Sequence, residues 1–150
     1  MSEGSGRGEG IAPDCQALLE QLPGATRFDR RLDGLWMAAP ALDVLAMAEL
    51  MHRLQARLST MTGVALDTGE TGIIYHYCLG VVPINIKAET RDRAIPSITP
   101  VTRAADWSER EIGDLYGVLF TGHPNPTRLI RPPSLPPGFF RDAGGGGRRG

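Results

Sequence analysis

The chain has 150 residues, 41% of them hydrophobic and 22% charged, which is typical of one globular domain large enough to bury its own core. Its 16 basic and 17 acidic side chains give a formal net charge of −1, so the composition does not favour nucleic acid as a partner. No apolar run approaches the roughly 20 residues that span a bilayer, and the first ten residues lack the apolar segment of a secretory signal. We therefore expect any attachment to a membrane to depend on another protein.

The two cysteines do not predict a metal or iron–sulfur site. Cys15 and Cys78 form no CxxC pair and no Cys/His pair at the spacing of metal ligands. An iron–sulfur cluster typically needs about four thiolates, so this chain is not expected to hold one by itself. Nothing in the sequence favours a disulfide between the two, and Cys78, in an apolar run, is expected to be a small core residue.

The two ends of the chain differ in composition from its middle. Residues 1–11 are rich in Gly, Ser and Glu, and residues 132–150 are rich in Pro and Gly. Segments of this kind bury too little apolar surface to offset the entropy lost on ordering. We expect a disordered N-terminal tail, a folded domain over residues 12–131, and a C-terminal tail that is extended or disordered.

The first predicted elements are a strand and an amphipathic helix. The apolar run at 34–39 precedes a proline and is typical of a short strand. Between 41 and 58 the apolar residues follow the i, i+3, i+4, i+7, i+11 spacing of a helix with one buried face; they are Met47, Leu50, Met51, Leu54 and Leu58. Asp43 suits the start of this helix, and Gly63 is expected to close the helical region.

The rest of the chain predicts a sheet and a second helix. After the turn "TGETG", the residues favour strands at 73–79, 83–88 and 97–101, with Gly80 in a tight connection and prolines confining the last strand to an edge. The strand at 83–88 alternates apolar and polar residues, so one of its faces should be solvated. A helix over 104–116 is expected to end at Gly117. This order predicts an α+β fold, with two helices packed on a small mixed β-sheet and a Pro-rich extended C-terminal segment.

The second helix, in the stretch "DWSEREIGDLYG", carries the densest group of ionisable side chains. Glu111 and Asp114 share a face, but Glu109 points away from Glu111, so the carboxylates do not converge as an acid/base pair. A metal site would need a histidine on the same face, and His123 lies beyond the helix. A stand-alone metal-dependent enzyme that uses Glu109, Glu111, Asp114 and His123 is one hypothesis, and a solvated helix face is another.

A third interpretation of this helix is a surface that contacts another protein. Its apolar side chains cover a broad arc: Trp107, Ile112, Leu115 and Tyr116. Gly113 in the helix interior costs roughly 1 kcal/mol relative to alanine. A helix with these features can be covered on more than one side, and its charges then need defined partners. Arg110 and Asp114, four residues apart, are able to form such a pair.

The three histidines all have structural interpretations. His76 lies between two tyrosines of a predicted strand and faces away from both, as a half-buried structural residue does. His52 is expected at the surface of the first helix. His123, in the tripeptide "GHP", is expected to pin a turn by hydrogen bonds.

The segment "ADWSEREIGDLYGVLFTGHPNPTRLI" resembles the signature of the 30-kDa subunit family of respiratory complex I, the NADH:quinone oxidoreductase. The positions that match are Trp107, Glu109, Arg110, Glu111, Asp114, Gly117, Phe120, Gly122, His123, Pro124 and Arg128. The preceding "IPSIT" is similar to a strand of that family, and the resemblance extends over roughly residues 32–131. Gly113 departs from the pattern, which usually has a larger residue at this position.

The resemblance implies a non-catalytic structural subunit with no cofactor, metal or catalytic residue of its own. In that family the subunit belongs to the peripheral arm of a membrane-associated oxidoreductase, on the cytoplasmic face of the membrane. The implied partners are a large, 49-kDa-like subunit and a small iron–sulfur subunit, which, with a flavin subunit, carry electrons from NADH to quinone. Glu109, Arg110, Glu111 and Asp114 are then expected to form ion pairs that hold the fold and its contact with those partners.

The resemblance leaves a second assignment open. Short forms of the family are similar to the related subunit of group 4 membrane-bound NiFe hydrogenases, of the energy-converting and formate-hydrogenlyase types. In those complexes the NiFe centre lies in the large subunit. The electron donor and acceptor would differ between the two assignments, and the sequence does not distinguish them.

Overall fold

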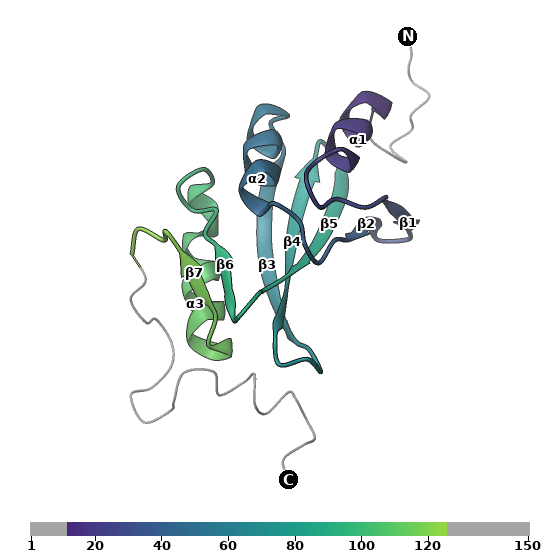
Figure 1. Ribbon diagram of the computed structural model, residues 1–150. Helices are drawn as coiled ribbons and strands as arrows, with labels where there is room; N and C mark the ends of the chain where they lie inside the picture. The colour runs from purple at the N-terminus through teal and green to yellow at the C-terminus, as the bar shows by residue number, and fades with distance from the viewer. Residues whose placement is uncertain (1–11, 126–150) are drawn as a thin grey trace.

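The central sheet is mixed and has five strands. The computed structural model describes residues 12–125, and in it the strand order is β1-β2-β5-β4-β3, with β2 parallel to β5 and the other neighbours antiparallel (Figure 1). A second sheet consists of the parallel strands β6 and β7. The elements are α1 (Pro13–Glu20), β1 (Asp29–Arg31), β2 (Gly34–Ala38), α2 (Val44–Arg53), β3 (Arg57–Ala65), β4 (Thr71–Leu79), β5 (Val82–Glu89), β6 (Ala94–Pro96), the 3₁₀ helix η2 (Arg103–Ala105), α3 (Asp106–Tyr116) and β7 (Leu119–Thr121).

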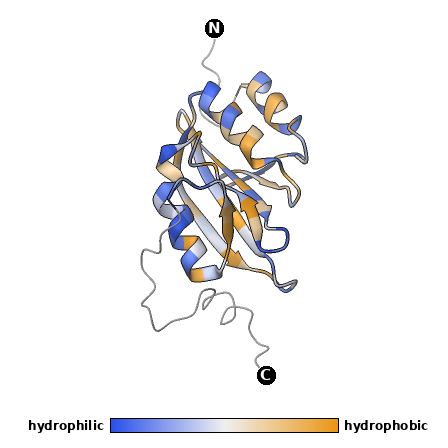
Figure 2. Ribbon diagram, turned by 60° about the vertical axis from the view of Figure 1, so that its left-hand side comes forward, coloured by the Kyte–Doolittle hydropathy of each residue, from blue (hydrophilic) through white to orange (hydrophobic). Residues whose placement is uncertain are grey.

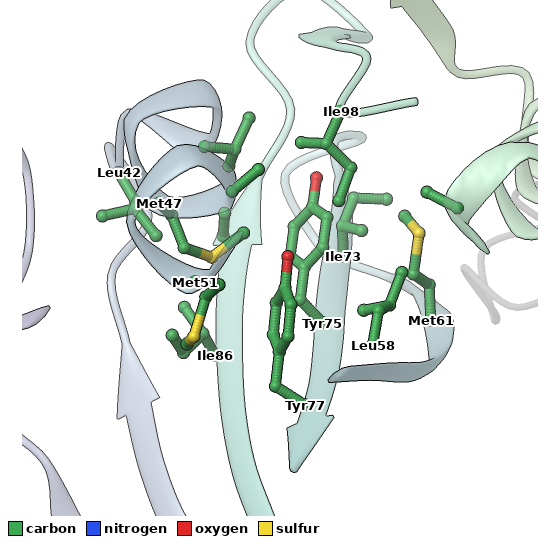
Figure 3. Packing of buried hydrophobic residues seen from close by; sticks show 14 of the residues in the cluster. Leu42, Met47, Met51, Leu58, Met61, Ile73, Tyr75, Tyr77, Ile86 and Ile98 are labelled. Atoms are coloured by element: carbon green, nitrogen blue, oxygen red, sulfur yellow. The ribbon is translucent and has the colours of Figure 1, made fainter. Parts of the chain in front are cut away.

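The core lies on one face of the large sheet. Alternate residues of β4 are buried, namely Ile73, Tyr75 and Tyr77, because successive side chains of a strand point to opposite faces. The same core cluster includes Met51 of α2 and Ile112 of α3, so both helices cover this face. Tyr75 and Tyr77 point in the same direction, toward Ile98, with α2 beside them (Figure 3). The predicted α+β class is confirmed, and the described residues contain a third helix, α1, that was not predicted.

Helix α2 begins where it was predicted and ends earlier. The side chain of Asp43 accepts a hydrogen bond from the Ala46 N–H at 3.0 Å, which caps the helix. The helix ends at Arg53, because Gln55 adopts φ 63° and turns the chain into β3. The predicted extension of the helix to Leu58 is therefore wrong, and Gly63 lies inside a strand.

Strand β3 was not predicted, because an irregularity hides its period. Leu58 and Met61 are both buried, and the pairing with β4 shifts register between Leu58 and Thr60. This bulge-like shift puts two core residues three positions apart, a spacing typical of helices rather than strands. At Gly63 the strand meets α3, where a Cβ atom would lie 2.9 Å from the ring of Tyr116.

The opposite face of the sheet is more polar. His76 lies there, half-buried, with one ring nitrogen 2.9 Å from Thr62 Oγ1 and the other 2.7 Å from Asn85 Oδ1. The structural interpretation of His76 is confirmed, as is the surface position of His52. The prediction of a solvated face on β5 is wrong at Asn85, which is buried. Cys78 is half-buried on this face rather than in the core, and both cysteines are free thiols.

The remaining outcomes concern the ends of the chain, its connections and membrane-spanning helices. The hairpin turn between β4 and β5 contains Gly80 at φ 65°, as predicted. The strand predicted at 97–101 is wrong, because β6 ends at Pro96 and the following residues form a turn. The predicted tails at 1–11 and 132–150 lie outside the described residues. Among the helices of residues 12–125, none is long and apolar enough to cross a bilayer.

Candidate functional site

Helix α3 is a largely hydrophilic element packed on an apolar layer (Figure 2). It follows directly from η2 and carries Asp106 and Glu109 in its first turn, where the helix dipole favours negative charge. Gly117, at φ 73°, ends the helix, and its N–H donates to the Gly113 carbonyl. A Cβ atom on Gly113 would lie only 3.0 Å from the carbonyl oxygen of Val118, so the returning chain accounts for this mid-helix glycine.

Glu109 is fully buried and receives three hydrogen bonds from one short loop. The hydroxyls of Ser97 and Thr99 donate to Oε1 at 2.6 and 2.8 Å, and the N–H of Ile98 donates to Oε2 at 2.7 Å. Hydrogen bonds to a charged acceptor are stronger than those between neutral groups. Glu109 therefore ties α3 to the loop after β6. Glu109 was predicted to form an ion pair, but in the structure its hydrogen-bond donors are two hydroxyls and a backbone N–H.

His123 joins the segment after β7 to the same helix. Its side chain is only 2% exposed, and Nδ1 accepts a hydrogen bond from the N–H of Asn125 at 2.8 Å. A neutral ring that accepts at Nδ1 carries its proton on Nε2. Nε2 lies 3.2 Å from Asp106 Oδ1 and 3.7 Å from Glu109 Oε1, but it makes no hydrogen bond to either. The prediction that His123 pins a turn is confirmed.

Asp106 connects this histidine to the outer side of the helix. Its Oδ1 also lies 3.1 Å from Nε of Arg110, four residues later. The Arg110 side chain is 16% exposed and that of Asp106 is 42% exposed, so the pair is partly shielded from solvent. Asp106 is thus paired with Arg110 and lies next to His123.

Burial raises the pKa of Glu109 above its ordinary value of 4.5. The hydrogen bonds from Ser97, Ile98 and Thr99, and then the nearby His123, act in the opposite direction without cancelling the effect of burial. Burial is also the main cause, and the Glu109 charge a further one, of the raised pKa of Tyr75 and of Tyr77. The carboxylate is therefore held in an environment that disfavours its own ionisation.

This shift predicts a pH-dependent stability. Because the folded state raises the pKa of Glu109, its favourable contribution is complete below the ordinary value of 4.5 and is lost as the pH rises through the raised value. Relative to a Glu109→Gln variant, the wild-type chain should therefore lose free energy of unfolding as the pH rises from 4.5, and then level off. Denaturant titrations of both proteins across this range measure the difference. A wild-type chain that becomes more stable relative to Glu109→Gln as the pH rises would contradict the prediction.

The structure places the remaining motif residues in different environments. Trp107 is 58% exposed, Glu111 is half-exposed and Asp114 is buried. Gly122 adopts φ 79° in the turn before His123, and Pro124 is exposed. Arg128 lies outside the described residues. Glu109, Glu111 and Asp114 do not form one cluster, and within residues 12–125 no three His, Cys, Asp or Glu residues are arranged to hold a metal ion.

The partners of Glu109 were missed by reasoning from the sequence. Ser97 and Thr99 alternate around the buried Ile98 and stand between two prolines, so they were interpreted as a strand edge. A signal was present in their hydroxyl groups. Ser and Thr two residues apart are able to donate to one buried carboxylate and leave the backbone N–H between them for the same acceptor.

Residues 38–141 match the family described as the 30-kDa subunit of respiratory-chain NADH dehydrogenase. The chain belongs to this family. The match extends over more than half of the chain and includes α3, its loop and the His123 turn. It confirms the resemblance seen in the motif at 107–124.

Two relatives that are similar in sequence support the assignment to the 30-kDa family. A subunit of the NADH-quinone oxidoreductase of Caulobacter sp. (strain K31) is 39% identical over 80 residues, which cover 49% of this chain and 37% of that protein. A longer subunit of the NADH-quinone oxidoreductase of Pseudomonas aeruginosa (strain UCBPP-PA14) is 34% identical over 88 residues, 56% of this chain and 15% of that protein. The chain thus aligns with well under half of the length of these relatives.

Two solved structures share the fold. One, titled as the membrane-bound sulfane sulfur reductase, an archaeal respiratory membrane complex, matches with a TM-score of 0.57 and 25% identity, covering 71% of this chain and 68% of the other. The other, a trypsin-resistant fragment of Nqo5, has the same TM-score at 20% identity and covers 75% of this chain and 93% of the fragment. At that identity the Nqo5 match supports the fold alone.

Proposed function

We propose that this 30-kDa-family chain is a non-catalytic subunit of the peripheral arm of an NADH:quinone oxidoreductase-like complex. In this role it docks on the large subunit and on the small iron–sulfur subunit and holds no cofactor of its own. The arm lies at the cytoplasmic face of the membrane, and the chain reaches the membrane only through the complex. The observation that carries the proposal is the family match over residues 38–141.

The geometry of α3 supports a docking role. Its inward carboxylate, Glu109, is fully used in holding the loop at 97–99, and His123 fixes the chain that follows β7. The family motif therefore builds a rigid unit of helix, loop and turn. The outward side of that unit, with the exposed Trp107, is available to another protein. Rigid elements are good supports for binding surfaces, because little entropy is lost on association.

A second candidate is the equivalent subunit of a related membrane complex, such as a group 4 NiFe hydrogenase. It is favoured by the similarity to the structure titled as the membrane-bound sulfane sulfur reductase, at 25% identity over 71% of this chain. In such a complex the large subunit would again be the docking partner. The electron donor and acceptor would be different.

The test is purification of the affinity-tagged chain from its native host in mild detergent. We expect a large subunit and a small iron–sulfur subunit to co-purify in equal amounts with the chain. NADH-binding and flavin subunits in the same preparation would indicate the complex I type, whereas a NiFe-bearing large subunit would indicate the hydrogenase type. Recovery of the chain without any redox subunit would contradict the proposal.

A further inference from the structure

The outward side of η2 and α3 carries an arginine and a tryptophan one helical turn apart in the sequence. Arg103 and Trp107 are four residues apart, in η2 and in the first turn of α3. Arg103 is exposed, and Trp107 is 58% exposed. Neither the guanidinium of Arg103 nor the indole N–H of Trp107 has a hydrogen-bond or ion-pair partner among residues 12–125. The surface therefore presents a cation and a large aromatic ring that the described fold does not use.

A hollow of about 430 Å³ opens beside Arg103. It is lined by Thr99, Pro100, Arg103, Asp106, Pro124 and Asn125. The hollow thus lies between the loop held by Glu109 and the turn held by His123. One wall is held by the buried hydrogen bond of Glu109 to the Ile98 N–H, and the other by the bond from the Asn125 N–H to His123, so the fold sets the shape of the hollow.

The charge balance of the hollow favours a negatively charged occupant. Asp106 is the acidic residue of its lining, and it is already paired with Arg110 at 3.1 Å. Arg103 has no such compensation within the described residues. A carboxylate that enters the hollow would pair with Arg103, and guanidinium groups bind carboxylates by two parallel hydrogen bonds.

A second hollow of similar size differs in that its arginines already have partners. It lies at the turn before β2 and has Arg30, Arg31 and the exposed Leu32 in its lining. There, Arg31 is paired with Asp29 at 3.1 Å and lies over the ring of Trp36, and Arg30 has partners as well. Its cations are engaged, so it lacks the uncompensated charge that distinguishes the hollow at Arg103.

We infer that the Arg103–Trp107 surface and its hollow bind an acidic, extended segment of a neighbouring subunit. A carboxylate of that segment pairs with Arg103, and an apolar side chain next to it packs on the Trp107 ring. Tryptophan and arginine are enriched among the few residues that carry most of the binding energy of an interface. The inference rests on the proposed function, because it assigns the chemistry of the partner segment at the docking surface.

The experiment uses the whole complex with a tagged copy of this chain. In one arm, Trp107 is replaced by the photo-crosslinking residue p-benzoylphenylalanine, and the crosslinked peptide is identified by mass spectrometry. We expect one peptide of a redox subunit, with Asp or Glu within a few residues of the crosslink. In a second arm, Arg103→Glu should reduce the retained complex about tenfold at physiological salt. Reversing the charge of the identified acidic residue should restore retention.

The controls separate this inference from the proposed function. Leu32→Ala and Arg91→Glu change an exposed apolar residue and an exposed arginine elsewhere, and they should leave retention unchanged. Thermal unfolding of each isolated variant checks that the fold is intact. If the wild-type chain brings down no redox subunit, the proposed function fails. If it does, but Arg103→Glu is retained equally or the crosslinked peptide has no acidic residue, only the inference fails.

Discussion

Replacing Glu109 by alanine is expected to lower the free energy of unfolding by about 3 kcal/mol. The substitution removes the acceptor of the Ser97 and Thr99 hydroxyls and of the Ile98 N–H, all of which are buried. A buried donor without an acceptor costs about 1 to 3 kcal/mol, and relaxation of the loop recovers part of the sum. Denaturant unfolding near neutral pH, followed by circular dichroism, measures the loss.

Two matched substitutions test whether the loss of stability comes from the buried position of Glu109 rather than from the loss of a negative charge. Glu111→Ala removes a half-exposed carboxylate two residues away and should change the free energy of unfolding by about 0.5 kcal/mol or less. Glu109→Gln keeps the size and one carbonyl acceptor for the Ile98 N–H, and its amide is able to donate to the two hydroxyls. It should be less damaging than Glu109→Ala. Equal stability of the alanine variants at 109 and 111 would contradict the clamp role of Glu109.

Replacing Gly24 by alanine is expected to cost about 3 kcal/mol or more. Gly24 adopts φ 81°, a conformation that L side chains rarely take. An added Cβ atom would overlap the carbonyl oxygen of Ala41 and lie 2.8 Å from Cα of Leu42. These are backbone atoms just before helix α2, so a side-chain rotation cannot relieve the overlap. The connection from α1 would have to move away from the start of α2.

Gly69→Ala is the matched control for this prediction. Gly69 has a similar φ of 92°, but an added Cβ atom would meet nothing within 4 Å. This variant should therefore show only the backbone cost, about 1 kcal/mol. The difference in melting temperature between the two variants isolates the steric contact. If both variants melt alike, the close approach of Gly24 to Ala41 does not contribute to stability.

Much of the fold could be predicted wherever the local pattern is regular. The start of α2 at Asp43, strands β4 and β5, the end of α3 at Gly117 and the turn at His123 all follow from periodicity, capping and turn chemistry. Strand β3 could not be predicted, because the shift between Leu58 and Thr60 makes its buried residues imitate a helix. Helix α1 was missed as well, since it contributes one buried residue, Leu19, to the core and shows little amphipathic pattern.

Only part of the candidate site could be predicted from the sequence. The spacing of Glu109, Glu111 and Asp114 argued against one convergent group of carboxylates, and the structure places them in different environments. The exposed position of Trp107 was not predicted. Exposure depends on which side of α3 faces the sheet, and that is decided by contacts such as Gly63 with Tyr116, which are far apart in the chain.

The order of the amino acids was enough to predict the α+β class, the family and the need of the α3 charges for defined partners. These follow from local periodicity, from a short specific motif and from the cost of burying charge. The identity of those partners came from the folded chain. Glu109 is bound by hydroxyls and an amide of the preceding loop, and Asp106 lies 3.2 Å from His123, because the fold of β6, β7 and α3 brings these groups together. Sequence spacing does not specify contacts between separate elements, and the hollow at Arg103 exists only through them.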